Sequence, residues 1–168
     1  IDENTLVVAC GGYSSESELR KVDLTTGAYT SLKLEMEFSY EYSTQPYTVT
    51  LSPFFVTYDH DMREMYTFAM RWNDVALAKT PLETMHVANT THTVLLETLT
   101  VPSSITYDSR EKLLYSVGAH RVTAVDTNTL SVKLRDAICG TTALEMSDMS
   151  VPTIHVDSDT GYLYGISE

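Results

Sequence analysis

A short pattern recurs three times along this chain at a fixed spacing. It reads VTYDHDMREMYTF from Val56, ITYDSREKLLYSV from Ile105 and IHVDSDTGYLYGI from Ile154, so each copy begins 49 residues after the one before. A period between roughly 20 and 50 residues is typical of repeat architectures, in which a unit buries its apolar face only against its neighbours. The repeat therefore constrains the architecture of the chain far more than its function.

Each repeat is predicted to consist of four short strands. Short β-branched runs, separated at even spacing by turn residues such as Asp, Asn and Gly, indicate antiparallel meanders. No segment shows a sustained apolar periodicity of a helix. The predicted strands are Leu6–Cys10, Leu19–Asp23, Tyr29–Leu34, Val75–Lys79, His92–Leu99, Ser103–Tyr107, Leu113–Val117, Arg121–Asp126 and Leu130–Arg135.

Four-stranded meanders that repeat at this length predict an all-β fold, a β-propeller. The "(I/V)TYD…(L/M)Y" opening and the "VDxxTG" turn resemble the repeats of six-bladed propellers of the NHL, YWTD and SMP-30 kind. The resemblance covers nearly the whole chain and implies architecture rather than activity, because one fold hosts many functions. The blades are predicted at residues 1–34, 51–99, 101–149 and 151–168, which amounts to about three and a half blades.

The predicted terminal half-blades do not complete one another, because each offers a second strand. Three explanations stay open: a fragment of a larger propeller, a ring completed by another chain, or a β-sandwich with internal repetition. The segment Glu35–Thr50 alternates like a strand at both ends, with Gln45-Pro46 breaking the middle, and is interpreted as an inter-blade loop, an exposed edge or a buried link between blades.

Six residues recur at the same repeat positions, three Asp and three Tyr. A position held in every repeat unit is best explained by the fold of the unit itself. We expect each Asp to cap the turn between the first and second strands, and each Tyr to pack between blades. These residues are Asp59, Asp108 and Asp157, and Tyr66, Tyr115 and Tyr164.

One turn carries alternating acidic residues before a glycine, Asp157-Ser158-Asp159-Thr160-Gly161. Carboxylate oxygens are the ligands that calcium prefers, so Asp157 and Asp159 are the candidate metal ligands and calcium the candidate cofactor. The competing interpretation is a tight turn held by an Asp side chain. His155 precedes this turn, and on an inner strand it would face a central channel.

The charge and the composition narrow the classes of partner. The net charge is −12, from 23 acidic and 11 basic residues, and such a surface repels phosphate backbones, which excludes nucleic acid as the expected partner. No apolar run reaches the length of a membrane span. Asn89 opens a glycosylation sequon, Asn-Thr-Thr, on a predicted loop. With low Lys and eleven Tyr, this favours a secreted or extracellular protein.

Cys10 and Cys139 fit no metal-binding or redox spacing. Because they fall two blades apart, we expect them not to be bonded to each other.

The sequence favours a non-enzymatic extracellular propeller module for protein interaction or structural assembly, whose partner is another protein or further blades. The chain contains no nucleophile elbow, P-loop or dinucleotide fingerprint. Two alternatives stay open. One is a metal-dependent hydrolase with a site in the channel, which needs convergent Asp, Asn, Glu or His. The other is a carbohydrate-binding propeller that uses the tyrosine-rich surface around Tyr13, Tyr29, Tyr40, Tyr42 and Tyr47.

Overall fold

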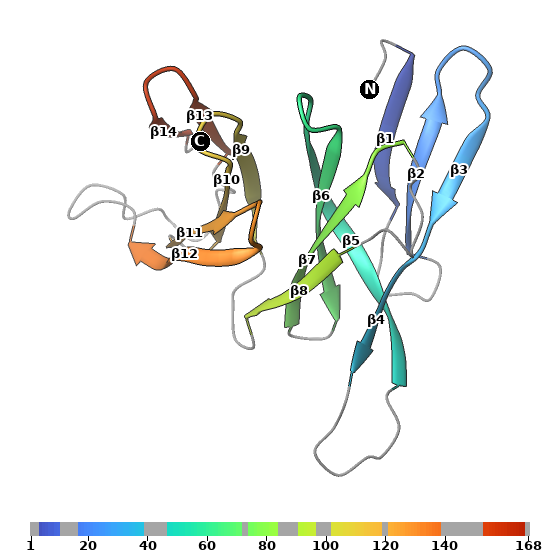
Figure 1. The fold of residues 1–168 in the computed structure, drawn as a ribbon, viewed down its shortest axis with the longest axis horizontal. Helices are drawn as coiled ribbons and strands as arrows, with labels where there is room; N and C mark the ends of the chain where they lie inside the picture. The colour runs from blue at the N-terminus through green and yellow to red at the C-terminus, as the bar shows by residue number, and fades with distance from the viewer. Residues whose placement is uncertain are drawn as a thin grey trace. The chain divides into compact units, whose positions relative to one another are not determined.

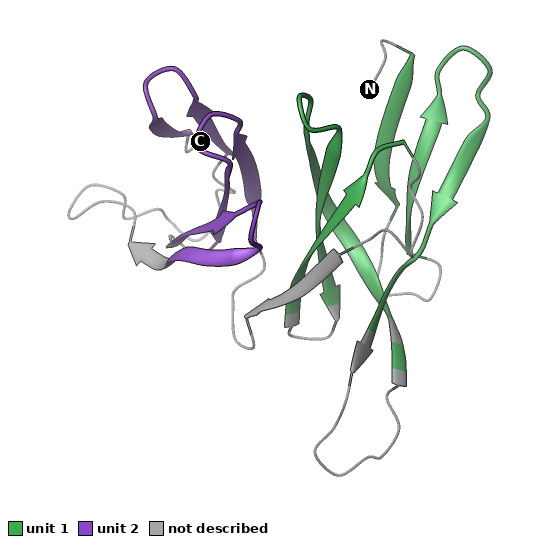
Figure 2. Cartoon of the chain, in the orientation of Figure 1, with its two compact units in different colours: residues 1–99 green, residues 100–168 purple. Residues whose placement is uncertain are grey.

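The computed structural model describes residues 4–10, 17–38, 47–71, 74–83, 91–96, 102–118, 121–138 and 153–166. All regular secondary structure in these ranges is β-strand, and every strand pairing is antiparallel (Figure 1). The prediction of an all-β chain is therefore confirmed. The chain divides into two compact units, residues 1–99 and residues 100–168 (Figure 2).

Unit 1 holds a three-stranded and a five-stranded sheet, in the orders β1-β2-β3 and β4-β5-β6-β7-β8. Within each sheet, every strand pairs with the next along the chain, as the meander pattern predicts. The strands are β1 (Thr5–Cys10), β2 (Glu18–Asp23), β3 (Tyr29–Leu32), β4 (Leu34–Phe38), β5 (Tyr47–Asp59), β6 (Glu64–Arg71), β7 (Asp74–Pro81) and β8 (Thr91–Leu96).

The segment interpreted as a loop or link, residues 35–50, forms two paired strands where the structure describes it. Leu34 in β4 lies opposite Leu51 in β5, and Phe38 lies opposite Tyr47. Strand β5 is 13 residues long. From Ser52 onward it pairs instead with β6, with a register shift between Pro53 and Phe55. Because proline has no N–H to donate, a bulge is where a strand accommodates it. The interpretation as a loop is thus wrong for residues 35–38 and 47–50.

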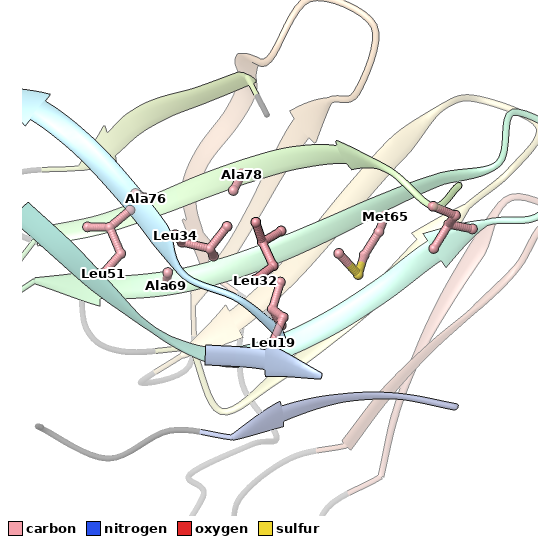
Figure 3. Close-up of a cluster of buried hydrophobic side chains, with 9 residues drawn as sticks. Leu19, Leu32, Leu34, Leu51, Met65, Ala69, Ala76 and Ala78 are labelled. Atoms are coloured by element: carbon pink, nitrogen blue, oxygen red, sulfur yellow. The ribbon is translucent and has the colours of Figure 1, made fainter. Parts of the chain in front are cut away.

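The core of unit 1 draws on both of its sheets. Strands β2 and β3 contribute Leu19 and Leu32, and these pack with Leu34 of β4 and Met65 of β6 (Figure 3). Full burial of an aliphatic side chain contributes about 1.5–3 kcal/mol, so this cluster holds the two sheets together. The other buried members are Leu51, Ala69, Ala76, Ala78 and Leu82.

Unit 2 holds a four-stranded sheet in the order β12-β11-β10-β9 and a two-stranded hairpin, β13-β14. The hairpin packs on β9. Predicted and observed starts differ by at most one residue in the four-stranded sheet, and β11 matches at both ends. The strands are β9 (Ser104–Asp108), β10 (Leu113–Gly118), β11 (Arg121–Asp126), β12 (Ser131–Ile138), β13 (Thr153–Asp157) and β14 (Tyr162–Ile166).

Strand β12 begins at Ser131, one residue later than predicted. Leu130 has a backbone φ of 54°, in the left-handed region that a strand residue does not occupy. Leu130 therefore closes the turn, although its side chain is of a type common in strands.

Among the described residues, no helix is long and apolar enough to cross a bilayer.

Candidate functional site

The three recurring aspartates lie at the same point of the same turn. In each, the carboxylate Oδ1 accepts hydrogen bonds from the backbone N–H groups two and three residues further on. Asp59 accepts at 2.9 and 3.1 Å, Asp108 at 2.9 and 3.2 Å, and Asp157 at 3.0 and 3.4 Å. The predicted capping of the turn between the first and second strands is confirmed.

Two further turns, between other strands, use the same device. Asp23 caps the β2–β3 turn at 2.8 and 3.0 Å, and Asp126 caps the β11–β12 turn at 2.9 and 3.1 Å. The sequence pattern linked Asp23 and Asp126 through their turn residues, but did not show that they are geometrically equivalent to Asp59, Asp108 and Asp157. The common rule is an Asp that ends a strand and folds the next residues back on its own carboxylate.

All five turns also share a residue in the left-handed region, four positions after the Asp. Glycine is the residue that adopts this conformation at least cost, because it lacks a Cβ. Only two of the five turns have glycine there, so the sequence alone does not reveal the rule. The φ values are 72° at Gly27, 54° at Arg63, 55° at Lys112, 54° at Leu130 and 73° at Gly161.

In the candidate calcium turn, both carboxylate oxygens of Asp157 accept hydrogen bonds from residues of the turn itself. Besides the two backbone bonds, Oδ2 of Asp157 accepts from the Thr160 hydroxyl at 2.8 Å. That bond and the Asp159 amide lower the pKa of Asp157 below its ordinary value. Among the described residues, no group of three or more His, Cys, Asp or Glu side chains is placed to hold a metal ion. Asp157 and Asp159 therefore lack a third such ligand in the described ranges.

The three recurring tyrosines differ in their surroundings. Tyr66 is only 1% exposed, and its hydroxyl donates to Glu64 Oε2 at 3.0 Å. Tyr115 is half-buried against the cluster of Val117, Val122 and Ile154, and this burial raises the pKa of its hydroxyl. Tyr164, by contrast, is 51% exposed. Tyr164 is thus not buried as Tyr66 is, and its packing between blades stays a prediction.

One face of the β9–β10 hairpin is covered by the β13–β14 hairpin, one repeat further on. Ser104 Oγ accepts a hydrogen bond from the backbone N–H of Ile154 at 3.1 Å, and Thr106 Oγ1 accepts one from Val156 at 3.2 Å. Ile154 then packs against Val117. Two backbone N–H groups of β13 are thus hydrogen-bonded to hydroxyl groups of the preceding repeat rather than to another strand.

Unit 1 carries a polar pocket of about 390 Å³ beside the β2–β3 turn. The Arg20 guanidinium lies over the Tyr29 ring, 4.9 Å from its centre, and Tyr29 is 60% exposed. Lys21 Nζ donates to the Leu82 carbonyl at 3.4 Å. The pocket combines one aromatic face with both signs of charge. Its lining residues are Thr5, Lys21, Asp23, Ala28, Tyr29, Thr30 and Glu83.

Other residues singled out in the sequence lie outside the sites or outside the described ranges. His60 and His155 are exposed, and no described acidic cluster adjoins either to form a metal site. Cys10 is half-buried and forms no disulfide with any described residue. Asn89 and Cys139 lie outside the described residues, as do Tyr13, Tyr40 and Tyr42.

No protein-family model and no curated protein matches the chain. Solved structures do match its fold, 28 chains in all. One is a chain of hydrazine synthase from Kuenenia stuttgartiensis, with a TM-score of 0.57 and 13% sequence identity. The match covers 99% of this chain and 56% of that one, so this chain spans little more than half of the matched chain. At this identity the similarity is one of fold alone.

Proposed function

We propose that this chain is a segment of a β-propeller, resembling the six-bladed NHL, YWTD and SMP-30 kind, and that it serves as a non-enzymatic module for protein interaction or structural assembly. The observation that carries the proposal is the seating of β13 on β9, in which repeats 49 residues apart are joined through Ser104 and Thr106. This is how a repeat protein buries a face that one unit cannot bury alone.

Distances between equivalent turns test whether the repeats are arranged in a ring, as in a propeller. Spin labels at His60→Cys, Ser109→Cys and Ser158→Cys, taken two at a time with Cys10 and Cys139 replaced by serine, report three separations. In a propeller the separation between labels at 60 and 109 equals that between labels at 109 and 158. For four to eight blades, the outer separation, between labels at 60 and 158, is about 1.4–1.9 times as long. An outer separation of twice the neighbouring one indicates a straight stack, and unequal neighbouring separations indicate a sandwich; either result contradicts a propeller.

The melting temperature with and without calcium tests the alternative of a metal-dependent hydrolase with a site in the channel. A ligand that binds only the folded state raises its stability, by about 2.7 kcal/mol at one hundred times its dissociation constant. An interaction module that holds no metal keeps the same melting temperature in chelator and in millimolar calcium. A rise in melting temperature that is abolished in Asp157→Asn would favour the metal-dependent alternative instead.

Secretion is part of the same proposal and rests on the sequon at Asn89 and the acidic composition. A surface loop of a secreted protein is where a glycan is accepted. We expect the chain isolated from its source to lose mass on treatment with a glycosidase, and an Asn89→Gln chain to show no such loss. An unmodified Asn89 in the native protein would remove the main support for an extracellular location.

Carbohydrate binding is the second candidate function, and the polar pocket at Tyr29 favours it. Sugars present apolar ring faces and hydroxyl groups, which an exposed aromatic ring and flanking charged side chains can meet. We expect glycan-array binding to be lost in Tyr29→Ala and retained in Tyr58→Ala, a control in the same unit that is 47% exposed. An array without hits would reject this function.

A further inference from the structure

The two hairpins of unit 2 present equivalent faces at a spacing of 49 residues. On β9–β10, Thr106 lies directly opposite Tyr115. On β13–β14, His155 lies directly opposite Tyr164. Residues opposite one another on adjacent strands point to the same face of a sheet. Ser104, Thr106 and Tyr115 therefore correspond to Thr153, His155 and Tyr164.

The first of these faces is covered. Ser104 and Thr106 accept backbone N–H groups of β13, and Tyr115 packs against the cluster that contains Ile154. The covering element is a strand whose buried residues, Ile154 and Val156, alternate with exposed ones. The hairpin that covers this face thus has two alternating buried side chains on its first strand, and backbone N–H groups on that strand donate to the covered face.

The second face is open in the described structure. Thr153 and His155 are exposed, and Tyr164 is 51% exposed. Tyr162, at 66% exposure, contacts Tyr164 edge to face with ring centres 6.5 Å apart. This face therefore exposes an aromatic ring and two hydrogen-bonding side chains at the repeat positions that β13–β14 covers on β9–β10.

We infer that the face formed by Thr153, His155 and Tyr164 docks a further strand–turn–strand hairpin of the same repeat type. The occupant presents two alternating apolar side chains on its first strand, as Ile154 and Val156 do. Thr153 Oγ1 and a His155 ring nitrogen accept two of its backbone N–H groups, because both side chains offer an acceptor lone pair. The inference rests on the proposed assembly function and names the chemistry of the partner.

The test uses the whole chain and a peptide probe. The probe is the sequence of residues 153–166, cyclised head to tail because an isolated two-stranded hairpin is marginally stable in water. We expect saturable binding with a dissociation constant below about 1 mM, and NMR shift changes centred on Thr153, His155 and Tyr164. Tyr164→Ser should weaken binding about tenfold or more, since the ring is the largest apolar surface of the face.

Matched controls distinguish specific binding at this face from non-specific binding of the probe elsewhere on the chain. Tyr58→Ser, at a similarly exposed tyrosine in the other unit, should bind the probe as the parent chain does. A probe with Ile154→Lys and Val156→Lys should not bind. Absence of binding, equal loss in Tyr58→Ser, or shift changes away from β13–β14 would overturn the inference.

A second copy of the chain is the other occupant that the experiment distinguishes. Self-association that Tyr164→Ser abolishes and that the probe cannot displace would mean a homotypic interface and would overturn hairpin docking. Failure of the probe leaves the spin-label separations unaffected, so the inference can fail while the ring survives. Separations that contradict a ring leave the probe experiment interpretable in turn.

Discussion

The hairpins β9–β10 and β13–β14 have the same pattern and the same Asp-capped turn, yet one has a covered face and the other an exposed one. Tyr115 is half-buried while its equivalent Tyr164 is mostly exposed. The local turn forms in both cases, because Asp108 and Asp157 accept hydrogen bonds from residues of their own turns. The difference teaches that the repeat sequence determines the hairpin, whereas its neighbour determines what the hairpin buries.

Tyr66 and Tyr164 give the largest expected contrast between copies of the repeat. Tyr66→Ala removes a side chain that is 1% exposed, and truncation of a buried aromatic costs about 3–5 kcal/mol. Tyr164→Ala removes an exposed ring and should leave the free energy of unfolding almost unchanged. Urea denaturation of both variants measures the contrast. Equal losses would mean that Tyr164 is covered in solution, for example by another hairpin.

The aspartates should show a smaller contrast in the same direction. Asp108 is 1% exposed, and Asp108→Ala leaves two backbone N–H groups without their acceptor, at a cost of about 2–3 kcal/mol. Asp157→Ala should cost less, because water reaches its turn. Asn at either position keeps a carbonyl acceptor and serves as the control. Identical losses in the two Ala variants would contradict a role for burial.

The left-handed position of the turn gives a contrast of opposite sign in the two hairpins. Lys112→Gly removes the Cβ conflict at φ 55° and should stabilise the chain by about 0.5–1 kcal/mol. Gly161→Ala introduces that conflict at φ 73° and should destabilise it by about 1 kcal/mol. An added Cβ at Gly161 meets no atom within 4 Å, so the effect isolates the backbone. Thermal melting of both variants checks the signs.

The smallest expected effect is on the dependence of stability on pH. The Thr160 hydroxyl and the Asp159 amide lower the pKa of Asp157 in the folded chain, and the Thr26 and Thr25 amides lower that of Asp23. A depressed pKa contributes stability that is present above the unfolded value, about 3.9, and is lost as the pH falls through the folded value.

Urea midpoints measured from about pH 7 down to pH 3 test this dependence. The midpoint should fall towards the acidic end, and Asp157→Asn should fall less steeply than the parent chain because it has no proton to bind there. A variant whose midpoint falls as steeply as that of the parent would show that Asp157 contributes nothing to the slope.

The sequence by itself determined the 49-residue repeat, the capped turns and the strands of the four-stranded sheet in unit 2. Apolar alternation predicted β11 at both ends, and the Asp at each strand end predicted the capped turns, because these features depend on residues a few positions apart. Residues 35–50 alternate like a strand at both ends, but the sequence did not show that these ends pair as β4 and β5, because the register depends on Leu34 meeting Leu51 in the core.

Only the tertiary structure decided which face of each hairpin is buried and where a pocket forms. Ser104 and Thr106 became acceptors for β13, while Thr153 and His155 stayed exposed, although their repeat positions are the same. Likewise Tyr29 and Glu83 line one pocket from positions far apart in the chain. Burial depends on which element packs against a surface, and a local sequence pattern does not contain that information.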